Sequence, residues 1–306
     1  MKKNTNKRGS WLAILSINNL SKSYKHKKIL NEINLTINSP GIWALVGPNG
    51  VGKTTFLNVV TNLLPATSGN IELMGKSNKD VSVFTDVSFL QDNSVLYDYL
   101  NGYDHLAFIC DVQKISKERM NEVVKYVGME NYAKRKIKDY SLGMKQHLLL
   151  AMAILNKPKL MFLDEPLNGL DPTSAILMRN ILLRLVEEGT TIILSSHNLS
   201  EIDRVTKKIL FLKDGKLLEE DMAKYEKIFY HFLCSDLKHA QHVLLEENVQ
   251  AVLTKKSLRI QIEHQTIQDL INIFHSHKIN IIDIQKEVIG SEKRYEELFN
   301  VHGDTT

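Results

Sequence analysis

Residues 47–55 combine glycines, a lysine and two threonines at a spacing that suits phosphate binding. They read GPNGVGKTT, which matches the Gly-x4-Gly-Lys-Thr pattern of the Walker A loop. The glycines let the backbone turn so that its N–H groups point toward one anion, and a helix that starts there adds positive field. In such a loop Lys53 reaches the β- and γ-phosphates, and the Thr54 hydroxyl binds Mg²⁺. The run predicts a nucleoside-triphosphate site formed by Gly47, Pro48, Asn49, Gly50, Val51, Gly52, Lys53, Thr54 and Thr55.

The segments on either side of this loop have the patterns that a phosphate loop needs. Residues 42–46 (IWALV) form a short apolar run, typical of a buried strand, and residues 56–60 (FLNVV) continue as a helix. A glycine-rich turn without a ligand is the alternative. The strand before the loop and the helix after it favour the phosphate site.

A second segment supplies the acidic side chains that a triphosphate site needs to hold Mg²⁺. Residues 160–163 (LMFL) are an apolar run that ends in Asp164 and Glu165. A strand of this kind delivers both carboxylates to its C-terminal edge, where ligands bind in open α/β sheets. We expect Asp164 to hold the Mg²⁺ shell and Glu165 to orient or deprotonate the attacking water. Taken alone, the run is equally compatible with a buried strand that ends in solvated acids.

Composition and charge set limits on the class of protein. Of 306 residues, 43% are hydrophobic and 24% charged, which is the balance of a soluble globular protein. No apolar run approaches the length of about 18 residues that a membrane span needs. The net charge of +4 does not by itself indicate nucleic-acid binding. Cys110 and Cys234 are far apart in apolar stretches, which favours buried thiols in a reducing cytosol.

The hydrophobic pattern changes along the chain. Residues 13–90 alternate short β-type runs with turns, which predicts an antiparallel lobe around the phosphate loop. Residues 92–158 are mainly helical in pattern. The core is expected to close near residues 209–217, where Asp214 and Gly215 mark a hairpin.

Residues 140–146 (YSLGMKQ) carry a resemblance to a known family. The segment resembles the Leu-Ser-Gly-Gly-Gln signature of the ATP-binding subunits of ABC transporters, and it lies at the family's usual distance before the acidic strand. Ser141 and Gly143 match the signature, whereas positions 140, 142 and 144 differ from it. A Ser-Leu-Gly-Met variant is typical of the branch for drug, bacteriocin-peptide and lantibiotic export and self-protection. His147 stands where the family usually has arginine.

The remaining motifs of the family occur in order. Gln91 matches the Q-loop, which in the family senses Mg²⁺ and the γ-phosphate and touches the membrane partner. Asp171 in GLDP matches the D-loop and is expected at the dimer interface. His197 after residues 191–194 matches the H-loop and is expected to contact the γ-phosphate, although an isolated histidine after a strand is more often structural. Tyr24 lies where the family stacks an aromatic ring on adenine, and an edge-strand tyrosine without a ligand is the alternative.

The resemblance implies a fold, a reaction and partners. The fold is α/β, a P-loop NTPase core of ABC type with an antiparallel β lobe and a helical subdomain. The implied reaction is ATP hydrolysis with ATP and Mg²⁺, coupled to export of a peptide, antibiotic or other amphipathic compound. A second ATPase subunit is implied, a homodimer more than a heterodimer, in which Ser141 and Gly143 of one copy cap the γ-phosphate bound by the other. The other partner is a separate polytopic permease, which places this chain in the cytoplasm at the inner face of the membrane.

We expect a basic tail at 1–10, an ABC ATPase domain at 11–221 with its helical subdomain at about 92–158, and an accessory domain at 222–306. The accessory segment has the pattern of a ferredoxin-like βαββαβ unit, with a structural or regulatory role. A metal site is weighed there and not favoured, since no cysteine or carboxylate cluster completes a ligand set. The histidines concerned are His231, His239, His242, His264, His275, His277 and His302.

Two other functions compete with this interpretation. A soluble ABC-type ATPase that works on nucleic acid or the ribosome usually has two cassettes, long coiled coils or zinc modules, and this chain has one cassette and none of the others. We therefore expect no nucleic-acid partner. An ordinary P-loop kinase or GTPase is opposed by the signature, by His197 and by the lack of an Asn-Lys-x-Asp guanine motif.

Overall fold

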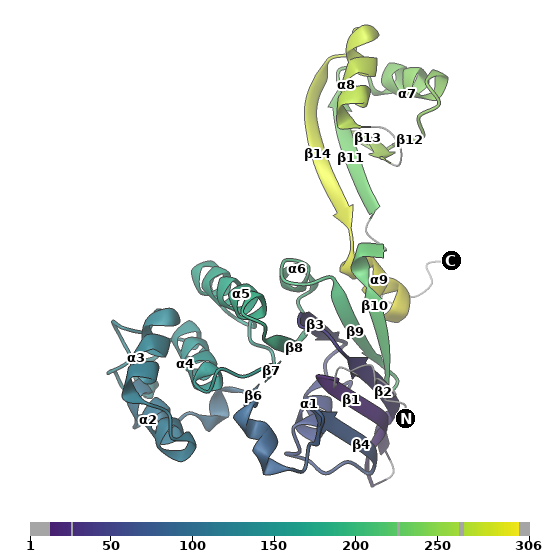
Figure 1. Cartoon of the computed structure of the whole chain (residues 1–306). Coiled ribbons are helices and arrows are strands. Elements are labelled where there is room, and N and C mark those ends of the chain that lie inside the picture. Colours follow the sequence, from purple (N-terminus) through teal and green to yellow (C-terminus); the bar gives the residue numbers. More distant parts are fainter. Residues whose placement is uncertain (1–12, 26, 225–226, 263–265, 300–306) are drawn as a thin grey trace, which may run out of the picture. The chain divides into compact units, whose positions relative to one another are not determined.

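The computed structural model describes residues 13–25, 27–224, 227–262 and 266–299. The basic tail expected at residues 1–10 lies outside them. Contacts within the chain define two compact units, Met1–Glu220 and Asp221–Thr306, which are described separately (Figure 1).

The first unit is built on a six-stranded sheet with the strand order β10-β9-β3-β8-β7-β6. The pairs β6–β7, β7–β8, β8–β3 and β3–β9 are parallel. Every residue of β3, β7 and β8 is buried, which explains why these strands are apolar along their length. The strands are β3 (Ile42–Val46), β6 (Val87–Leu90), β7 (Leu160–Leu163), β8 (Thr191–Ser196), β9 (Lys208–Lys213) and β10 (Lys216–Asp221).

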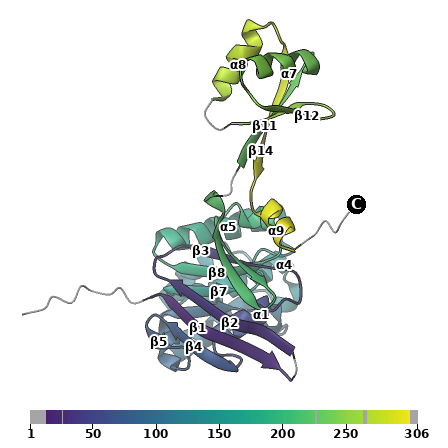
Figure 2. The same ribbon diagram turned by 90° about the vertical axis from the view of Figure 1, so that its right-hand side faces the viewer.

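A four-stranded antiparallel sheet forms a second layer of this unit, with the order β2-β1-β4-β5 (Figure 2). Its strands are β1 (Leu15–Tyr24), β2 (Lys27–Ile37), β4 (Ser68–Leu73) and β5 (Lys76–Ser77). Apolar residues from Ile33 to Ile37 of β2 are buried and alternate with exposed neighbours, and β1 shows the same alternation from Leu15 to Asn18 before it breaks between Asn18 and Leu20. This alternation is expected when one face of a sheet packs on a core.

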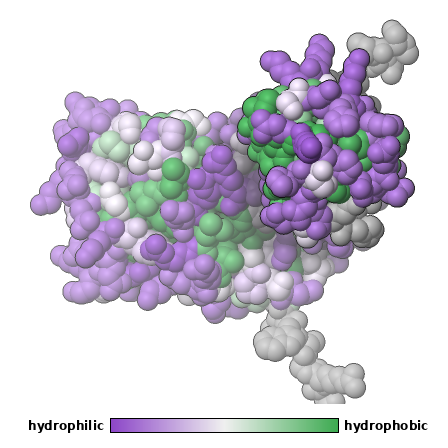
Figure 3. Space-filling model, turned by 90° about the horizontal axis from the view of Figure 1, so that it is seen from above, coloured by the Kyte–Doolittle hydropathy of each residue, from purple (hydrophilic) through white to green (hydrophobic). Residues whose placement is uncertain are grey.

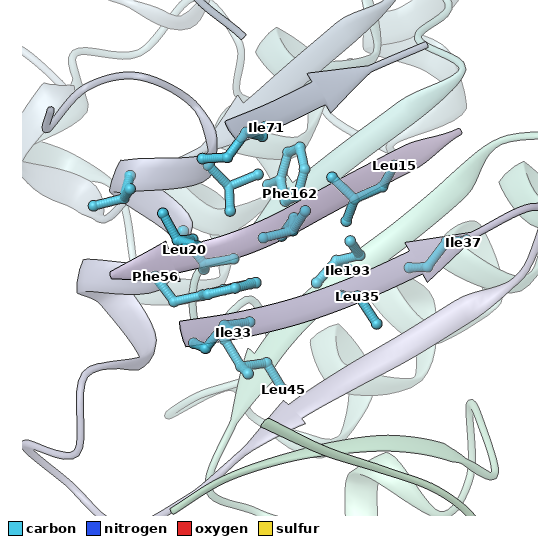
Figure 4. Packing of buried hydrophobic residues seen from close by; sticks show 14 of the residues in the cluster. Leu15, Leu20, Ile33, Leu35, Ile37, Leu45, Phe56, Ile71, Phe162 and Ile193 are labelled. Carbon is cyan, nitrogen blue, oxygen red and sulfur yellow. The ribbon is translucent and has the colours of Figure 1, made fainter. Parts of the chain in front are cut away.

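The core between the two sheets joins side chains that are far apart in sequence. Leu15 and Leu20 of β1 and Ile33 of β2 belong to one buried cluster with Phe162 of β7 and Ile193 of β8 (Figure 4). The helix after the phosphate loop, α1 (Lys53–Val60), contributes further side chains to this cluster. The cluster therefore ties the antiparallel lobe to the strands that carry the candidate site.

Helices α2, α3 and α4 form a separate group at one side of the first unit in Figure 1. Their bounds are α2 (Gly102–Gln113), α3 (Lys117–Tyr126) and α4 (Leu142–Ile154). Besides α1, the first unit also contains α5 (Pro172–Glu187) and α6 (Leu199–Ile202). Each of α2, α3 and α4 begins at a residue whose side chain accepts a backbone N–H of the first turn, namely Asn101, Ser116 and Ser141. Short 3-10 turns occupy Val81–Thr85, Asn93–Val95, Ile137–Asp139 and Met222–Lys224.

The second unit has the element order βαββαβ followed by a helix. Its strands pair in the order β12-β13-β11-β14, and each neighbouring pair is antiparallel. The elements are β11 (Lys227–Cys234), α7 (Leu237–Glu246), β12 (Ala251–Leu253), β13 (Leu258–Gln261), α8 (Ile267–Ser276), β14 (Ile281–Ile289) and α9 (Ser291–Phe299). Phe232 of β11 and Phe274 of α8 meet in its core with ring centroids 5.1 Å apart.

A polar network joins three strands of the second unit. The Glu287 Oε2 atom lies 2.9 Å from His231 Nε2 and 2.8 Å from Arg259 Nε. The hydrogen bond from His231, assisted by Arg259, lowers the pKa of Glu287. Among the described residues, no group of three or more histidine, cysteine, aspartate or glutamate side chains is arranged to hold a metal ion. His264 and His302 lie outside the described residues.

Candidate functional site

The parallel register brings three candidate segments to one edge of the six-stranded sheet. Strand β8 lies between β3 and β7, with Val46 opposite Ser196 and Leu163 opposite Leu194. The chain leaves these strands in the same direction. The glycine loop after β3, the acidic pair after β7 and His197 after β8 therefore come together.

The glycines of the loop adopt backbone angles, or lie close to neighbouring atoms, in ways that a residue with a Cβ atom would not tolerate. Gly50 and Gly52 have φ values of 78° and 114°, in the left-handed region. A Cβ atom on Gly52 would lie 2.7 Å from Ile29 Cγ2, and one on Gly47 would lie 2.8 Å from the Leu212 carbonyl oxygen. Helix α1 starts after Gly52 with no side-chain cap. Its first N–H groups thus face the loop as an anion site.

Lys53 points into the loop rather than away from it. The side chain is only 7% exposed. Its Nζ donates to the Gly47 carbonyl oxygen at 2.8 Å and lies 3.7 Å from Glu165 Oε1. A buried ammonium in this position can neutralise the charge of a bound phosphate chain.

The acidic pair is held by the neighbouring strand. The Ser195 hydroxyl donates to Asp164 Oδ1 and accepts from the Glu165 backbone N–H at 2.9 Å. Glu165 has a φ of 50°, so a non-glycine residue occupies the left-handed region at this point. The backbone there turns sharply, and the two carboxylates have different partners.

His197 completes the contacts of the Glu165 carboxylate. The His197 Nδ1 atom lies 2.9 Å from Glu165 Oε2, and Lys53 approaches Oε1 of the same carboxylate. A carboxylate fixed from two sides is suited to accept a proton from a water molecule.

A cavity of about 450 Å³ lies over this group. It is lined by Asn49, Gly50, Gly52, Lys53, Thr54, Thr55, Glu165, Asn168 and His197. Sequence reasoning missed Asn168 and Ser195. Ser195 has a signal in hindsight, because a hydroxyl near the end of the apolar run 191–196 needs a partner when buried. The position of Asn168 depends on the turn after Glu165, where its N–H donates to the Glu165 carbonyl oxygen.

Several of the expected site residues do not line this cavity, among them Asp164, Gln91 and Tyr24. Gln91 lines a separate hollow of about 340 Å³, together with Phe89, Val95 and mostly apolar side chains. Tyr24 ends β1 with 45% of its surface exposed, and the Lys22 Nζ lies 4.9 Å from its ring centroid. The roles of Gln91 and Tyr24 toward a nucleotide therefore stay predictions.

The signature residues lie at the start of α4, apart from this cavity. Ser141 caps the helix, with its hydroxyl oxygen accepting the Met144 N–H at 3.3 Å. Gly143 is buried, and a Cβ atom there would lie 2.6 Å from the Ser174 hydroxyl oxygen. Tyr140, which replaces the leucine of the signature, is buried, and its hydroxyl donates to the Tyr132 carbonyl oxygen at 3.1 Å.

Asp171 is engaged within its own chain. It caps α5, with Oδ1 accepting the Thr173 and Ser174 N–H groups and Oδ2 accepting the Ser174 hydroxyl at 2.7 Å. These bonds, led by the Ser174 hydroxyl, lower the pKa of Asp171. The carboxylate thus shapes the loop that precedes α5.

No helix within the described ranges has both the length and the apolar character to cross a membrane. The face seen in Figure 3 is largely hydrophilic, with hydrophobic areas scattered among the polar ones. The loop between β3 and α1, facing Glu165 and His197 at the ends of neighbouring parallel strands, defines a nucleoside triphosphatase of the P-loop class.

Comparisons with known proteins narrow this class. The family model described as ABC transporter matches residues 30–168. The lantibiotic transport ATP-binding protein SrtF of Streptococcus pyogenes is 38% identical over 209 residues, which cover 68% of this chain and 90% of that protein. The bacitracin transport ATP-binding protein BcrA of Bacillus licheniformis is 32% identical over 86% of this chain and 85% of its own length. This chain belongs to the ABC transporter family, as an ATP-binding subunit that hydrolyses ATP.

Solved structures support the fold. A structure described as the ATP binding subunit of an ABC transporter has a TM-score of 0.63 at 19% identity, covering 85% of this chain and 99% of that chain. A dimeric ATP-binding cassette in a post-hydrolysis state, bound to ADP and Pi, has a TM-score of 0.62 at 24% identity, covering 68% of this chain and 98% of that chain. The α/β cassette fold expected from the sequence is confirmed.

Proposed function

We propose that two copies of this subunit close around ATP and drive export of a peptide antibiotic or similar amphipathic compound through a separate permease. The observation that carries the dimer is that the cavity of one subunit is lined by only one half of the expected site. The phosphate loop, Glu165 and His197 share a cavity, whereas Ser141 and Gly143 lie on a helix that does not line it. A second copy can supply the missing half.

The proposal assigns roles to residues of the cavity and to two residues outside its lining, Asp164 and Gln91. The loop N–H groups and Lys53 bind the phosphates, and the Thr54 hydroxyl, the Asp164 carboxylate and the Gln91 side chain would supply oxygen ligands to Mg²⁺. When bound, Mg²⁺ neutralises charge on the phosphate oxygens. Glu165 accepts a proton from the attacking water, while His197 orients Glu165 and reaches toward the terminal phosphate.

The interface residues act from the other copy. Ser141 and Gly143 would approach the terminal phosphate through the N-terminus of α4. Asp171 lies at the same interface, and its carboxylate fixes the shape of the loop before α5 rather than reaching the nucleotide. The adenine would stack on Tyr24, which is exposed enough to accept a ring.

The hollow that includes Gln91 is the proposed contact with the permease. Phe84, Phe89, Val95 and Ile109 make it largely apolar. Phe108 and Val112, one turn apart on the same helix as Ile109, are 71% and 65% exposed, and apolar side chains exposed together favour a protein partner. Docking there would keep the subunit at the inner face of the membrane.

The substrate class rests on the relatives. SrtF carries lantibiotic transport in its name, and the BcrA proteins carry bacitracin transport. Both compounds are peptide antibiotics. We infer a substrate of this class for the present chain.

A mixing experiment tests the dimer. A Ser141→Arg subunit keeps an intact phosphate loop, and a Lys53→Ala subunit keeps an intact signature. Each variant alone should be inactive, and a mixture should regain part of the ATPase activity because one composite site is whole. Activity of Ser141→Arg alone, or a silent mixture that demonstrably forms heterodimers, would count against the arrangement. Co-purification with a polytopic membrane protein tests the permease contact in parallel.

A further inference from the structure

Two segments of the first unit that are far apart in sequence lie side by side. Residues 97–101 come just before α2, and residues 134–138 come shortly before α4. The Ile137 N–H donates to the Leu100 carbonyl oxygen at 2.8 Å, and one antiparallel bridge also joins the segments. The Ile137 side chain is fully buried. The two segments are therefore held together, and their exposed side chains lie close to one another.

The later segment carries a cluster of exposed cations. These are Lys134, Arg135, Lys136 and Lys138. Among the residues that the structure describes, none of the four takes part in an ion pair, and Asp98 of the earlier segment lies 3.9 Å from Lys145 instead. Glu130 and Asp139 are the acids beside the cluster in sequence, and the cations outnumber them by two to one. An excess of positive charge therefore remains at this surface.

The earlier segment adds two exposed aromatic rings. Tyr97 is 58% exposed and Tyr99 is 68% exposed, and their ring centroids are 5.8 Å apart. The Tyr97 ring also stacks on His105 in the first turn of α2, with centroids 6.1 Å apart. Phe108 lies one turn further along this helix. The tyrosines thus connect the cationic cluster with the exposed apolar side chains proposed to contact the permease.

Cations and tyrosines exposed together suit the region where a lipid bilayer meets water. Anionic headgroups attract lysine and arginine side chains. Tyrosine is enriched at the same depth, because its ring is apolar and its hydroxyl is polar. A single strand of nucleic acid also combines positive charge with stacking on aromatic rings. Val112, exposed on the same helix face as Phe108, has no ring to stack on a base and favours the lipid surface.

We propose that anionic headgroups of a lipid bilayer bind one surface of this subunit, here called the basic surface, formed by Tyr97, Tyr99, Lys134, Arg135, Lys136 and Lys138. The inference goes beyond the proposed function, in which the permease alone holds the subunit at the membrane. Two attachments to one bilayer strengthen each other, because the first raises the effective concentration of the second. Only the expectation that both attachments meet the same membrane rests on the proposed function.

Sedimentation of the full chain with lipid vesicles tests the basic surface without ATP and without a permease. One set of vesicles contains phosphatidylcholine alone, and the other contains equal parts of phosphatidylcholine and the anionic phosphatidylglycerol. The parent should sediment mainly with the anionic vesicles. This preference should shrink when salt is raised from about 0.1 M to about 1 M, because the Debye length falls from about 10 Å to about 3 Å.

The double variant Lys134→Gln/Lys138→Gln removes two cations from the basic surface. Its partition onto the anionic vesicles should fall by about 25-fold, which is about fivefold or ~1 kcal/mol for each cation. Urea unfolding and the basal ATPase rate should be unchanged, because both side chains are exposed and neither lines the cavity at the phosphate loop. Tyr99→Ser should weaken binding by less, with a loss that depends little on salt.

Lys255→Gln/Lys256→Gln is the matched control. These two lysines are exposed in the second unit, so the control has the same change in net charge at another place. Its binding to the anionic vesicles should equal that of the parent. The basic residues within 1–10 are present in every protein, and the difference between the variants is therefore the readout.

Three results would overturn the inference. The parent could bind both kinds of vesicle equally, or the two double variants could lose binding equally, which would be an effect of net charge alone. In the third result, Lys134→Gln/Lys138→Gln keeps its binding to anionic vesicles but loses binding to a single-stranded oligonucleotide or co-purification with the permease. Failure of the proposed function is a separate outcome, in which Ser141→Arg stays active, and vesicle binding does not depend on it.

Discussion

Two helix N-termini of this chain are expected to face the same phosphate group, and they are built differently. Helix α1 begins after Gly52 with no side-chain cap, so its first N–H groups remain available to a ligand. Helix α4 begins at Ser141, whose hydroxyl oxygen already accepts the Met144 N–H. The N–H groups at the start of α1 can bind an anion within one chain. At the start of α4, the Met144 N–H is already bonded to Ser141, and we expect this helix to meet the nucleotide only in the dimer.

The residues around the two helix N-termini also differ. Lys53, Glu165 and His197 contact one another at the edge of the parallel sheet. Gly143 instead packs on Ser174 of a neighbouring helix. Strand register fixes the first half of the site, and helix packing fixes the second. Substitutions in the two halves of the site should therefore have different effects on ATP binding, ATP hydrolysis and folding stability.

The largest effect is expected from Glu165→Gln, in the half that contains the phosphate loop. Loss of a general base costs about 10²- to 10⁴-fold in rate, while ATP binding should persist and an ATP-stabilised dimer should accumulate. Steady-state ATPase assays and size-exclusion chromatography with ATP measure both. Glu187→Gln, on the exposed side of α5, is the control. Undiminished turnover of Glu165→Gln would remove Glu165 from the chemistry.

The second-largest effect is expected from Lys53→Ala, which should weaken the binding of ATP. A hydrogen bond to a charged group contributes about 1.5–3 kcal/mol, so the dissociation constant for ATP should rise by about 10- to 100-fold. Titration with a fluorescent ATP analogue measures it, with the exposed Lys79→Ala as the control. Equal affinity in Lys53→Ala and the parent would mean that the ammonium does not contact the phosphates.

Gly143→Ala tests the half that depends on helix packing. The added Cβ would press on the Ser174 hydroxyl, and overpacking of this kind costs about 1–3 kcal/mol of folding free energy. Urea unfolding should show this loss, and ATPase activity should fall with ATP affinity retained. Adding Ser174→Ala should restore part of the stability. A Gly143→Ala protein as stable as the parent would argue against the tight contact.

The smallest effect is expected from Ser141→Ala. Loss of a serine cap costs about 1 kcal/mol of folding free energy. Ser116 caps α3 with the same geometry, its oxygen accepting the Arg119 N–H at 3.3 Å, so Ser116→Ala should cost a similar amount. Only Ser141→Ala should also lower the ATPase rate. If both variants hydrolyse ATP equally well, Ser141 is a structural cap and the comparison between α1 and α4 loses its functional meaning.

The sequence was sufficient for the elements that local spacing determines. The run at 47–55 covers the turn after β3 and the first residues of α1, and Asp164 follows a buried strand. Both could be predicted because glycine spacing and apolar runs act over short distances. The cassette fold followed from the order of the motifs. These features need no knowledge of which strands are neighbours.

Contacts across the sheet could not be foreseen in the same way. The Ser195 bonds to Asp164 and to the Glu165 backbone depend on the register between β7 and β8. The commitment of Asp171 to the cap of α5 likewise depends on a side-chain rotamer. Residue types limit the possible hydrogen-bond partners, but the strand register and the side-chain packing determine which partners are used.

The left-handed backbone at Glu165 sets folding stability against ATP turnover. A conformation with a φ of 50° costs an ordinary side chain about 1–2 kcal/mol, a cost that glycine largely escapes. A chain selected only for thermal endurance would gain by replacing Glu165 with glycine, and it would lose the proposed general base. If Glu165 has that role, screens for stabilising substitutions should return inactive proteins at this position, because stability there is gained at the expense of turnover.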